Sequence, residues 1–189
     1  MYLFFDTETT GAPKNYKAPV TDLKNWPRLV QIAWIKHDKN GETLGTECFV
    51  IKPNGFTIPA EATNIHGITT DHALEHGVDL LQVLEHLSKE IDTCQYLIAH
   101  NINFDQNIVG AEFLRHKMVN SIPRKKLLCT MTTSTNYCAI KGSYGFKYPR
   151  LTELHQKLFK CTYSDAHNAL TDITATAKCF WEMRKRGLI

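Results

Sequence analysis

The 189-residue sequence lacks the features that direct a chain to a membrane, to export or to a zinc site. No apolar run approaches the ~20 residues that a membrane-spanning helix needs. The N-terminus has neither a basic segment nor a small-residue cleavage site, so we expect residues 1–10 to belong to the fold and the protein to be cytoplasmic. The six cysteines form no CxxC pair and no zinc-type spacing with histidine, so we expect reduced and mostly buried thiols.

Internal repeats, low-complexity tracts and Gly/Ser linkers are also missing. With 43% hydrophobic residues, the chain suits one compact domain over residues 1–189. Its net charge of +3 permits an anionic partner without requiring one.

Short runs of apolar and β-branched residues predict an α/β fold with a mixed five-stranded sheet. The DKNG turn at 38–41 joins two of the strands as a hairpin, so the first three strands are expected to be antiparallel. The later strands alternate with helices, which places helices on both faces of the sheet. The expected strands cover about 2–6, 29–36, 44–51, 96–99 and 126–129.

Helical spacing of apolar residues predicts the main helices. The first has a stripe of Leu80, Leu81, Val83, Leu84, Leu87 and Ile91. The last is expected to start near Asp165, with Leu170, Ile173, Ala177 and Phe180 buried. Other helices are expected at about 104–118, 131–138 and 150–159.

Two acids end the first strand. Side chains alternate along a strand, so Asp6 and Glu8 point the same way, and their repulsion raises both pKa values unless a cation lies between them. Hard carboxylate oxygens suit Mg²⁺ or Mn²⁺. The alternative is a solvated strand end finished by a polar turn.

Two further motifs carry acids. HNINFD at 100–105 follows a short buried strand and places Asp105 in the first turn of the next helix. In DAHNALTD at 165–172, Asp172 is expected to share a polar helical face with Asp165 and Asn168, and His167 to lie in or just before the first turn. Helix capping or a solvated helix face would explain each motif alone.

Together, four carboxylates and one histidine can build a two-metal centre for hydrolysis of a phosphodiester. In such a centre the metal ions lower the pKa of a water and offset charge on the phosphate, while a nearby histidine accepts the proton.

FDTETTG at 5–11, HNINFD and HNALTD at 167–172 resemble the three motifs of the DnaQ-like 3′–5′ exonucleases, in their histidine-bearing (DEDDh) branch. NIHGIT at 64–69 is similar to the family's loop between the third strand and the following helix. The resemblance covers nearly the whole chain and is greatest to the proofreading epsilon subunit of bacterial DNA polymerase III. It implies an RNase H-like fold and release of nucleoside 5′-monophosphates from single-stranded or frayed DNA 3′ ends.

The resemblance also implies roles for the acids and the histidine. Asp6, Glu8 and Asp172 would hold the first of two divalent ions, Mg²⁺ or Mn²⁺. Asp6 would bridge to the second ion and Asp105 would act on it. His167 would be the general base.

Five further residues would contact the substrate if the resemblance holds. The backbone around Thr7 and Thr9 would meet the terminal nucleotide. Ile65, His66 and Phe104 would wedge against the terminal bases and the 3′ end, although Phe104 could instead anchor its helix in the core.

Residues 12–27 form a Pro- and Lys-bearing loop. Its cations, with Trp26 and Arg28, could contact phosphates and stack on a base; alternatively, the loop is solvated and Trp26 folds inward. An RNA 3′–5′ exonuclease of the RNase T or oligoribonuclease type is the alternative activity, and a non-catalytic nucleic-acid-binding module is a further one. A DNA polymerase subunit is a candidate partner.

Overall fold

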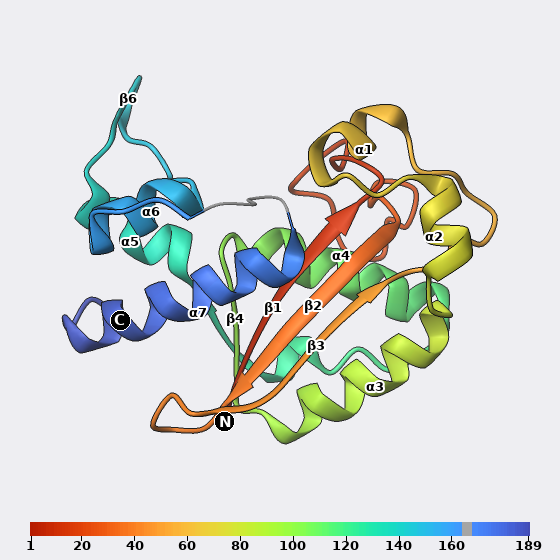
Figure 1. Cartoon of the computed structure of the whole chain (residues 1–189), viewed down its shortest axis with the longest axis horizontal. Helices are drawn as coiled ribbons and strands as arrows, with labels where there is room; N and C mark the ends of the chain where they lie inside the picture. Colours follow the sequence, from red (N-terminus) through yellow and green to blue (C-terminus); the bar gives the residue numbers. More distant parts are fainter. Residues whose placement is uncertain (164–167) are drawn as a thin grey trace.

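The fold is built on a five-stranded mixed sheet with the spatial order β3-β2-β1-β4-β5. The computed structural model describes residues 1–163 and 168–189. β1, β2 and β3 are antiparallel neighbours, whereas β4 runs parallel to β1 and β5 parallel to β4 (Figure 1). The predicted mixed sheet, with three antiparallel strands first, is confirmed. The strands are β1 (Tyr2–Thr9), β2 (Leu29–His37), β3 (Thr43–Val50), β4 (Tyr96–Ala99) and β5 (Lys126–Cys129).

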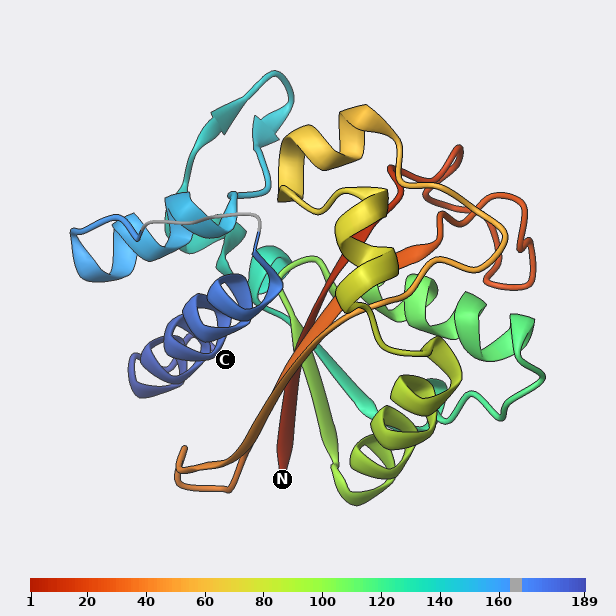
Figure 2. The same ribbon diagram turned by 45° about the vertical axis from the view of Figure 1, so that its right-hand side comes forward.

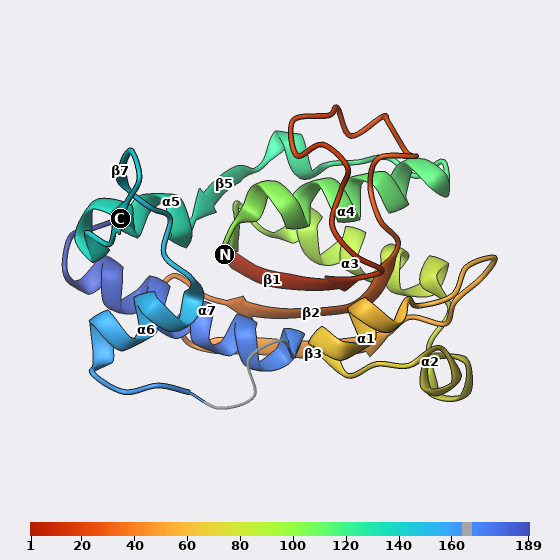
Figure 3. The same cartoon turned by 90° about the horizontal axis from the view of Figure 1, so that it is seen from above.

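Helices lie on both faces of this sheet, as expected (Figure 3). Alternation along β1 divides the core, because Leu3 and Phe5 pack with α3 and α4 while Tyr2 and Phe4 pack with α7. The helices are α1 (Ala60–His66), α2 (Thr70–His76), α3 (Leu80–Thr93), α4 (Ile102–Arg115), α5 (Thr130–Cys138), α6 (Leu151–Phe159) and α7 (Ala169–Lys185), with a 3₁₀ turn η1 (Ile122–Arg124).

The α3 prediction holds except at one position. The side chain of Asp79 caps the helix by accepting hydrogen bonds from the backbone N–H groups of Leu81 and Gln82. The inner face consists of Leu80, Val83, Leu84, Leu87 and Ile91. Leu81 was expected to widen this stripe, but it is 39% exposed because its position turns it away from the sheet.

The start of α7 differs from the prediction. The helix begins at Ala169, because Asn168 has an extended backbone and its side chain accepts hydrogen bonds from the N–H groups of Leu170 and Thr171. Asn168 is therefore a cap and does not share a helical face with Asp172. Leu170 is 37% exposed, whereas Ile173 packs on β2 as expected. Asp165 lies outside the described residues.

Two parts of the chain contain elements that the sequence did not predict. Residues 64–66 of the expected NIHGIT loop belong to α1, which ends at Gly67 in a left-handed conformation (φ 77°) before Thr69 caps α2. Between α5 and α6, a small hairpin forms from β6 (Lys141–Gly142) and β7 (Gly145–Phe146).

All six cysteines are unpaired, as predicted, although only Cys94, Cys138 and Cys179 are buried. In the two described ranges, no helix combines the length and the apolar character that crossing a membrane requires.

Candidate active site

The first two acids lie on the central strand of the sheet. β1 pairs with β4 only from Tyr2 to Phe4 but continues beside β2 to Thr9, so its last residues extend beyond their parallel neighbour. Asp6 and Glu8 share the face of β1 that α7 covers, as the alternation predicts.

The third acid comes from the first turn of α7. The Gln31 side chain of β2 accepts a hydrogen bond from the Ala169 N–H at 3.2 Å, which fixes the start of the helix against the sheet. Asp172 follows three residues after Ala169, still in the first turn of the helix. Carboxylate oxygens of Asp6, Glu8 and Asp172 all lie within 4.8 Å of one another, so strand and helix bring together three of the predicted ligands.

The fourth acid, Asp105, is buried at the start of α4. Asn101, in a left-handed conformation (φ 81°), turns the chain sharply from β4 into this helix. The Thr7 N–H and hydroxyl both donate to Asp105 Oδ1, at 3.0 and 2.7 Å. Asp105 is thus held against the back of β1, outside the three-residue group but close enough for its charge to act on Asp6.

Burial and mutual repulsion disfavour the ionised forms of these carboxyl groups. Burial, followed by the charges of Asp105, Glu8 and Asp172, raises the pKa of Asp6 well above its ordinary value. Burial and Asp172 raise the pKa of Glu8 to about 8. Burial also raises the pKa of Asp105 to about 7, although the hydrogen bonds from Thr7 act in the opposite direction.

These carboxylates fit a hard divalent cation. In the described part of the chain, no lysine or arginine is among the groups that shift the three pKa values. Oxygen donors from separate elements converge within a few ångströms, which is the donor set that Mg²⁺ and Mn²⁺ prefer.

Sequence reasoning missed one side chain that contacts the cluster. The Tyr163 hydroxyl donates to Asp172 Oδ1 at 2.8 Å, and burial together with this bond raises the pKa of the tyrosine. Tyr163 belongs to none of the motifs, so the sequence contained no signal for it. The predicted base, His167, lies outside the described residues.

Next to the acids lies a cavity of about 510 Å³, which we call the hairpin-side cavity. Its lining joins two of the acids to the segment that follows the β6–β7 hairpin. The lining residues are Asp6, His100, Met131, Tyr148, Pro149, Arg150, Leu151, Thr152, Tyr163 and Asp172.

His100, from the HNINFD motif, holds one wall of this cavity in place. Its Nε2 lies 2.9 Å from the Pro149 carbonyl oxygen and its Nδ1 lies 3.0 Å from the Thr130 hydroxyl. A carbonyl can only accept, so Nε2 carries the proton. Burial lowers the pKa of His100 to about 4, which keeps the ring neutral as a structural tie.

A smaller pocket of about 220 Å³, the α1-side pocket, lies next to Glu8. It gathers four of the five predicted substrate contacts, namely Thr9, Ile65, His66 and Phe104. The Tyr16 ring, 6.4 Å from that of Phe104, also lines it and was not predicted. The fifth residue, Thr7, is buried elsewhere and uses its N–H and hydroxyl on Asp105.

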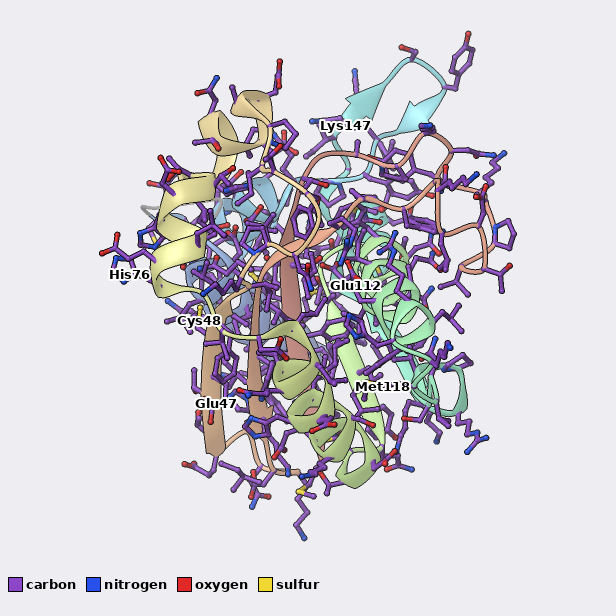
Figure 4. All side chains as sticks on the ribbon, turned by 90° about the vertical axis from the view of Figure 1, so that its right-hand side faces the viewer. Glu47, Cys48, His76, Glu112, Met118 and Lys147 are labelled. Carbon is purple, nitrogen blue, oxygen red and sulfur yellow. The ribbon has the colours of Figure 1, made fainter. Side chains whose placement is uncertain are left out.

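The long loop between β1 and β2 is held to α4. Trp26 is 2% exposed and donates to the Pro19 carbonyl, so the inward alternative is correct and stacking on a base is excluded. Arg28 pairs at 2.8 Å with Glu112, a buried residue of α4 (Figure 4). Arg115 donates to the carbonyls of Leu23 and Trp26.

Comparison with known proteins agrees with this fold. A family model described as an exonuclease matches residues 3–180. DNA polymerase III PolC-type from Listeria monocytogenes is 28% identical over 191 residues, covering 97% of this chain and 11% of the relative. The 3′–5′ exonuclease DinG of Bacillus subtilis is 29% identical, covering 98% of this chain and 18% of the relative. The chain therefore spans a small part of these curated relatives.

Solved structures of exonuclease I share the fold. The zinc-bound E. coli exonuclease I–ssDNA complex superposes with a TM-score of 0.76 at 22% identity, over 98% of this chain and 40% of that one. Exonuclease I from Methylocaldum szegediense gives a TM-score of 0.72 at 21% identity, again over 98% and 40%.

The five-stranded sheet and its helices have the RNase H-like fold that the motifs implied. More specifically, the chain belongs to the exonuclease family whose model covers residues 3–180, which confirms the predicted family and its class as a phosphodiester hydrolase.

Proposed function

We propose that residues 1–189 form a single catalytic domain that hydrolyses phosphodiester bonds at the 3′ end of DNA and releases nucleoside 5′-monophosphates. The observation that carries the proposal is the convergence of Asp6, Glu8 and Asp172 within 4.8 Å, with Asp105 buried behind them. Such a cluster of repelling acids is costly to fold, and divalent cations would offset that cost.

Asp6, Glu8 and Asp172 would hold a first divalent ion, Mg²⁺ or Mn²⁺. Asp6 would also contact a second ion, on which Asp105 would act. When bound, these ions would lower the pKa of a water and offset charge on the phosphate. The surrounding residues orient the ligands, because Thr7 donates to Asp105 and Tyr163 donates to Asp172.

His167 is the proposed general base. It immediately precedes the α7 cap Asn168 in the sequence, so it is close along the chain to Asp172. A base placed within reach of the attacking water would contribute about 10²–10⁴-fold to the rate.

The α1-side pocket is the proposed site of the terminal nucleotide. Thr9, Ile65, His66 and Phe104 line it directly beside Glu8, so a 3′-terminal sugar and base there would place the adjoining phosphate near the acids. Tyr16 and Phe104 offer aromatic surface against which a base can pack.

DNA is the proposed substrate, because the DNA polymerase III PolC-type relatives from Listeria align with nearly all of this chain. The same relatives suggest a DNA polymerase subunit as a partner. The unpaired state of all six cysteines supports a reducing compartment such as the cytoplasm.

A digestion of matched 5′-labelled DNA and RNA oligonucleotides tests the proposal, with Mg²⁺, Mn²⁺ or EDTA. We expect a ladder shortened from the 3′ end with either ion and none with EDTA. Asp6→Asn should be inactive, whereas Asp92→Asn, which changes an exposed acid at the far end of α3, should behave as wild type. Cleavage by Asp6→Asn, or cleavage in EDTA, would contradict the metal assignment. Preferential digestion of RNA would transfer the proposal to RNA ends.

A further inference from the structure

The β6–β7 hairpin is the most exposed aromatic region of the molecule. Within the two described ranges, four aromatic side chains are exposed, and three of them lie here. Tyr144, at the turn, is fully exposed, whereas Phe146 and Tyr148 are 52% and 62% exposed. In Figure 2 the hairpin (cyan) and α1 (yellow-orange) both project beyond the end of the sheet.

Such exposure has a cost in free energy, because burying an aromatic side chain away from water would stabilise the protein. The backbone pairing in this hairpin is short, with Lys141 opposite Phe146 and Gly142 opposite Gly145, and one further bond from the Lys147 N–H to the Ile140 carbonyl at 2.9 Å. Because these aromatic side chains stay exposed, they contribute little to folding. Such an exposed group is typical of a surface that binds a partner or ligand.

The charge of this segment is positive. Between Ala139 and Thr152 the sequence contains three cations, Lys141, Lys147 and Arg150, and no acid. Lys147 and Arg150 contact Glu153 at 2.7 and 3.4 Å, which offsets one of the charges and fixes these two side chains at the base of the hairpin. Figure 4 shows Lys147 on this projecting part of the molecule.

The hairpin is continuous with the active site. Tyr148, Pro149 and Arg150 lead from the hairpin into α6 and also line the hairpin-side cavity together with Asp6 and Asp172. The bond from His100 Nε2 to the Pro149 carbonyl ties this segment to the end of β4. A nucleic-acid strand that leaves the acids through this cavity would therefore contact Arg150 and Tyr148 next.

We propose that the hairpin binds the single-stranded nucleic acid on the 5′ side of the scissile phosphate. Its aromatic rings would stack on successive bases, and Lys141 and Arg150 would contact phosphates. The inference rests on the proposed function, because the terminal nucleotide in the α1-side pocket leaves the hairpin-side cavity as the exit for the rest of the strand.

Single-stranded nucleic acid fits this surface better than a protein partner does. Stacking platforms for single strands combine aromatic rings with cations that follow the backbone, and both features occur here in one short segment. Continuity with a cavity that contains the acids also favours the substrate itself.

The test compares a substrate that reaches the hairpin with one that does not. The long probe is a 5′-fluorescein-labelled oligothymidylate of about 12 nucleotides, within the ~4–16 nucleotides that one such surface covers. The short one is thymidine 5′-p-nitrophenyl phosphate, which can occupy only the acids and the pocket beside them. Affinity for the long probe is measured by fluorescence anisotropy with a 3′-terminal phosphorothioate that resists cleavage.

The double variant Tyr144→Ser/Phe146→Ser should raise the Kd of the oligonucleotide about 10- to 100-fold, because each lost stack weakens binding. The ratio of kcat/KM for the oligonucleotide to kcat/KM for the ester should fall by a similar factor. The aromatic exchange Tyr144→Phe/Phe146→Tyr should retain affinity. Val119→Ser, which also replaces an exposed apolar side chain, is the matched control on a different loop.

A charge variant tests the phosphate contacts separately. Lys141→Ala should lower the slope of log Kd against log salt concentration by about 0.7, the value for one phosphate contact on a single strand. Lys39→Ala, in the exposed β2–β3 turn, should leave the slope at its wild-type value.

Unchanged oligonucleotide affinity in the Ser double variant would overturn the inference, as would an equal loss of ester and oligonucleotide turnover. An inactive wild-type protein whose oligonucleotide binding still depends on Tyr144 and Phe146 would refute the proposed hydrolysis but support the hairpin as a binding surface. A repetition with oligouridylate shows whether the hairpin distinguishes RNA from DNA.

Discussion

The two hollows on either side of the acids are built in different ways. The α1-side pocket, about 220 Å³, contains Glu8, and most of its residues come from three recognisable motifs. The hairpin-side cavity, about 510 Å³, contains Asp6 and Asp172, and most of its wall comes from residues 148–152 and Tyr163, outside any motif. The first is therefore lined mainly by residues of the sequence motifs, and the second mainly by residues outside them.

This difference distinguishes residues that hydrolysis of any substrate requires from residues that only a long substrate contacts. The pocket beside Glu8 is small enough for one nucleotide and is formed by the end of β1, the start of the loop after it, α1 and the first turn of α4. The larger cavity opens toward a hairpin whose aromatic side chains have no role in the core. We therefore expect variants on the first side to affect every substrate, and variants on the second to affect long substrates most.

The largest expected effect comes from the acids, which belong to both sides. Glu8→Gln and Asp172→Asn should each lower kcat by roughly 10³-fold or more, since several kcal/mol of charge stabilisation depends on the ions. The loss should be equal for thymidine 5′-p-nitrophenyl phosphate and for a single-stranded oligonucleotide. If Glu8→Gln spared one of the two substrates, the acids would not form one site.

The same contrast shows what the sequence could predict. Alternation along β1 and the helix after β4 correctly placed Asp6, Glu8 and Asp105, because both depend on local periodicity. The start of α7 was misplaced because Asn168 is a good cap, and capping competes with extension of the helix toward Asp165. Spacing alone cannot distinguish an asparagine that caps a helix from one inside the helix.

Features that depend on distant contacts could not be predicted. Trp26 is buried because Pro19 accepts its N–H and Arg115 holds the loop carbonyls, and neither bond has a local signal. The hairpin has only two paired residues in each strand, too few to give a periodic pattern. The contact of Tyr163 with Asp172 is a tertiary contact between the residues after α6 and the first turn of α7.

The next largest effect should come from the α1-side pocket. Phe104→Ala removes a ring that lines this pocket and is expected to raise KM about tenfold for the ester and the oligonucleotide alike. The ratio of their kcat/KM values should stay constant, in contrast to the hairpin variants. Ile65→Ser, at an exposed position, should give a smaller change in the same direction without affecting Tm. A selective loss on the oligonucleotide would assign Phe104 to the other side.

A smaller effect is expected from Tyr163, which acts through Asp172. Tyr163→Phe removes the hydrogen bond to Asp172 Oδ1 and should lower kcat about tenfold with little change in KM, since bonds to charged groups contribute about 1.5–3 kcal/mol. As a positioning residue, it should also weaken the apparent affinity for Mg²⁺, measured from the dependence of the rate on its concentration. Tyr137→Phe, which loses a surface contact with Arg186, is the matched control. Normal Mg²⁺ dependence in Tyr163→Phe would argue against this role.

The smallest effect concerns stability without metal. Because the folded-state pKa values of Glu8 and Asp105 are raised to about 8 and about 7, folding favours their protonated forms, and that contribution is complete below their unfolded pKa values of about 4. Between the unfolded and the folded pKa values the folded state binds more protons than the unfolded state, so stability falls as the pH rises from about 4 and the fall ends above about 8. The Tm in EDTA should therefore decline across this window by about 2–4 °C for each kcal/mol lost. Mn²⁺ should reverse the fall by offsetting the charges. Glu8→Gln should make the decline in Tm shallower and end it near pH 7, where Asp105 finishes titrating. An unchanged profile would show that Glu8 does not contribute to it.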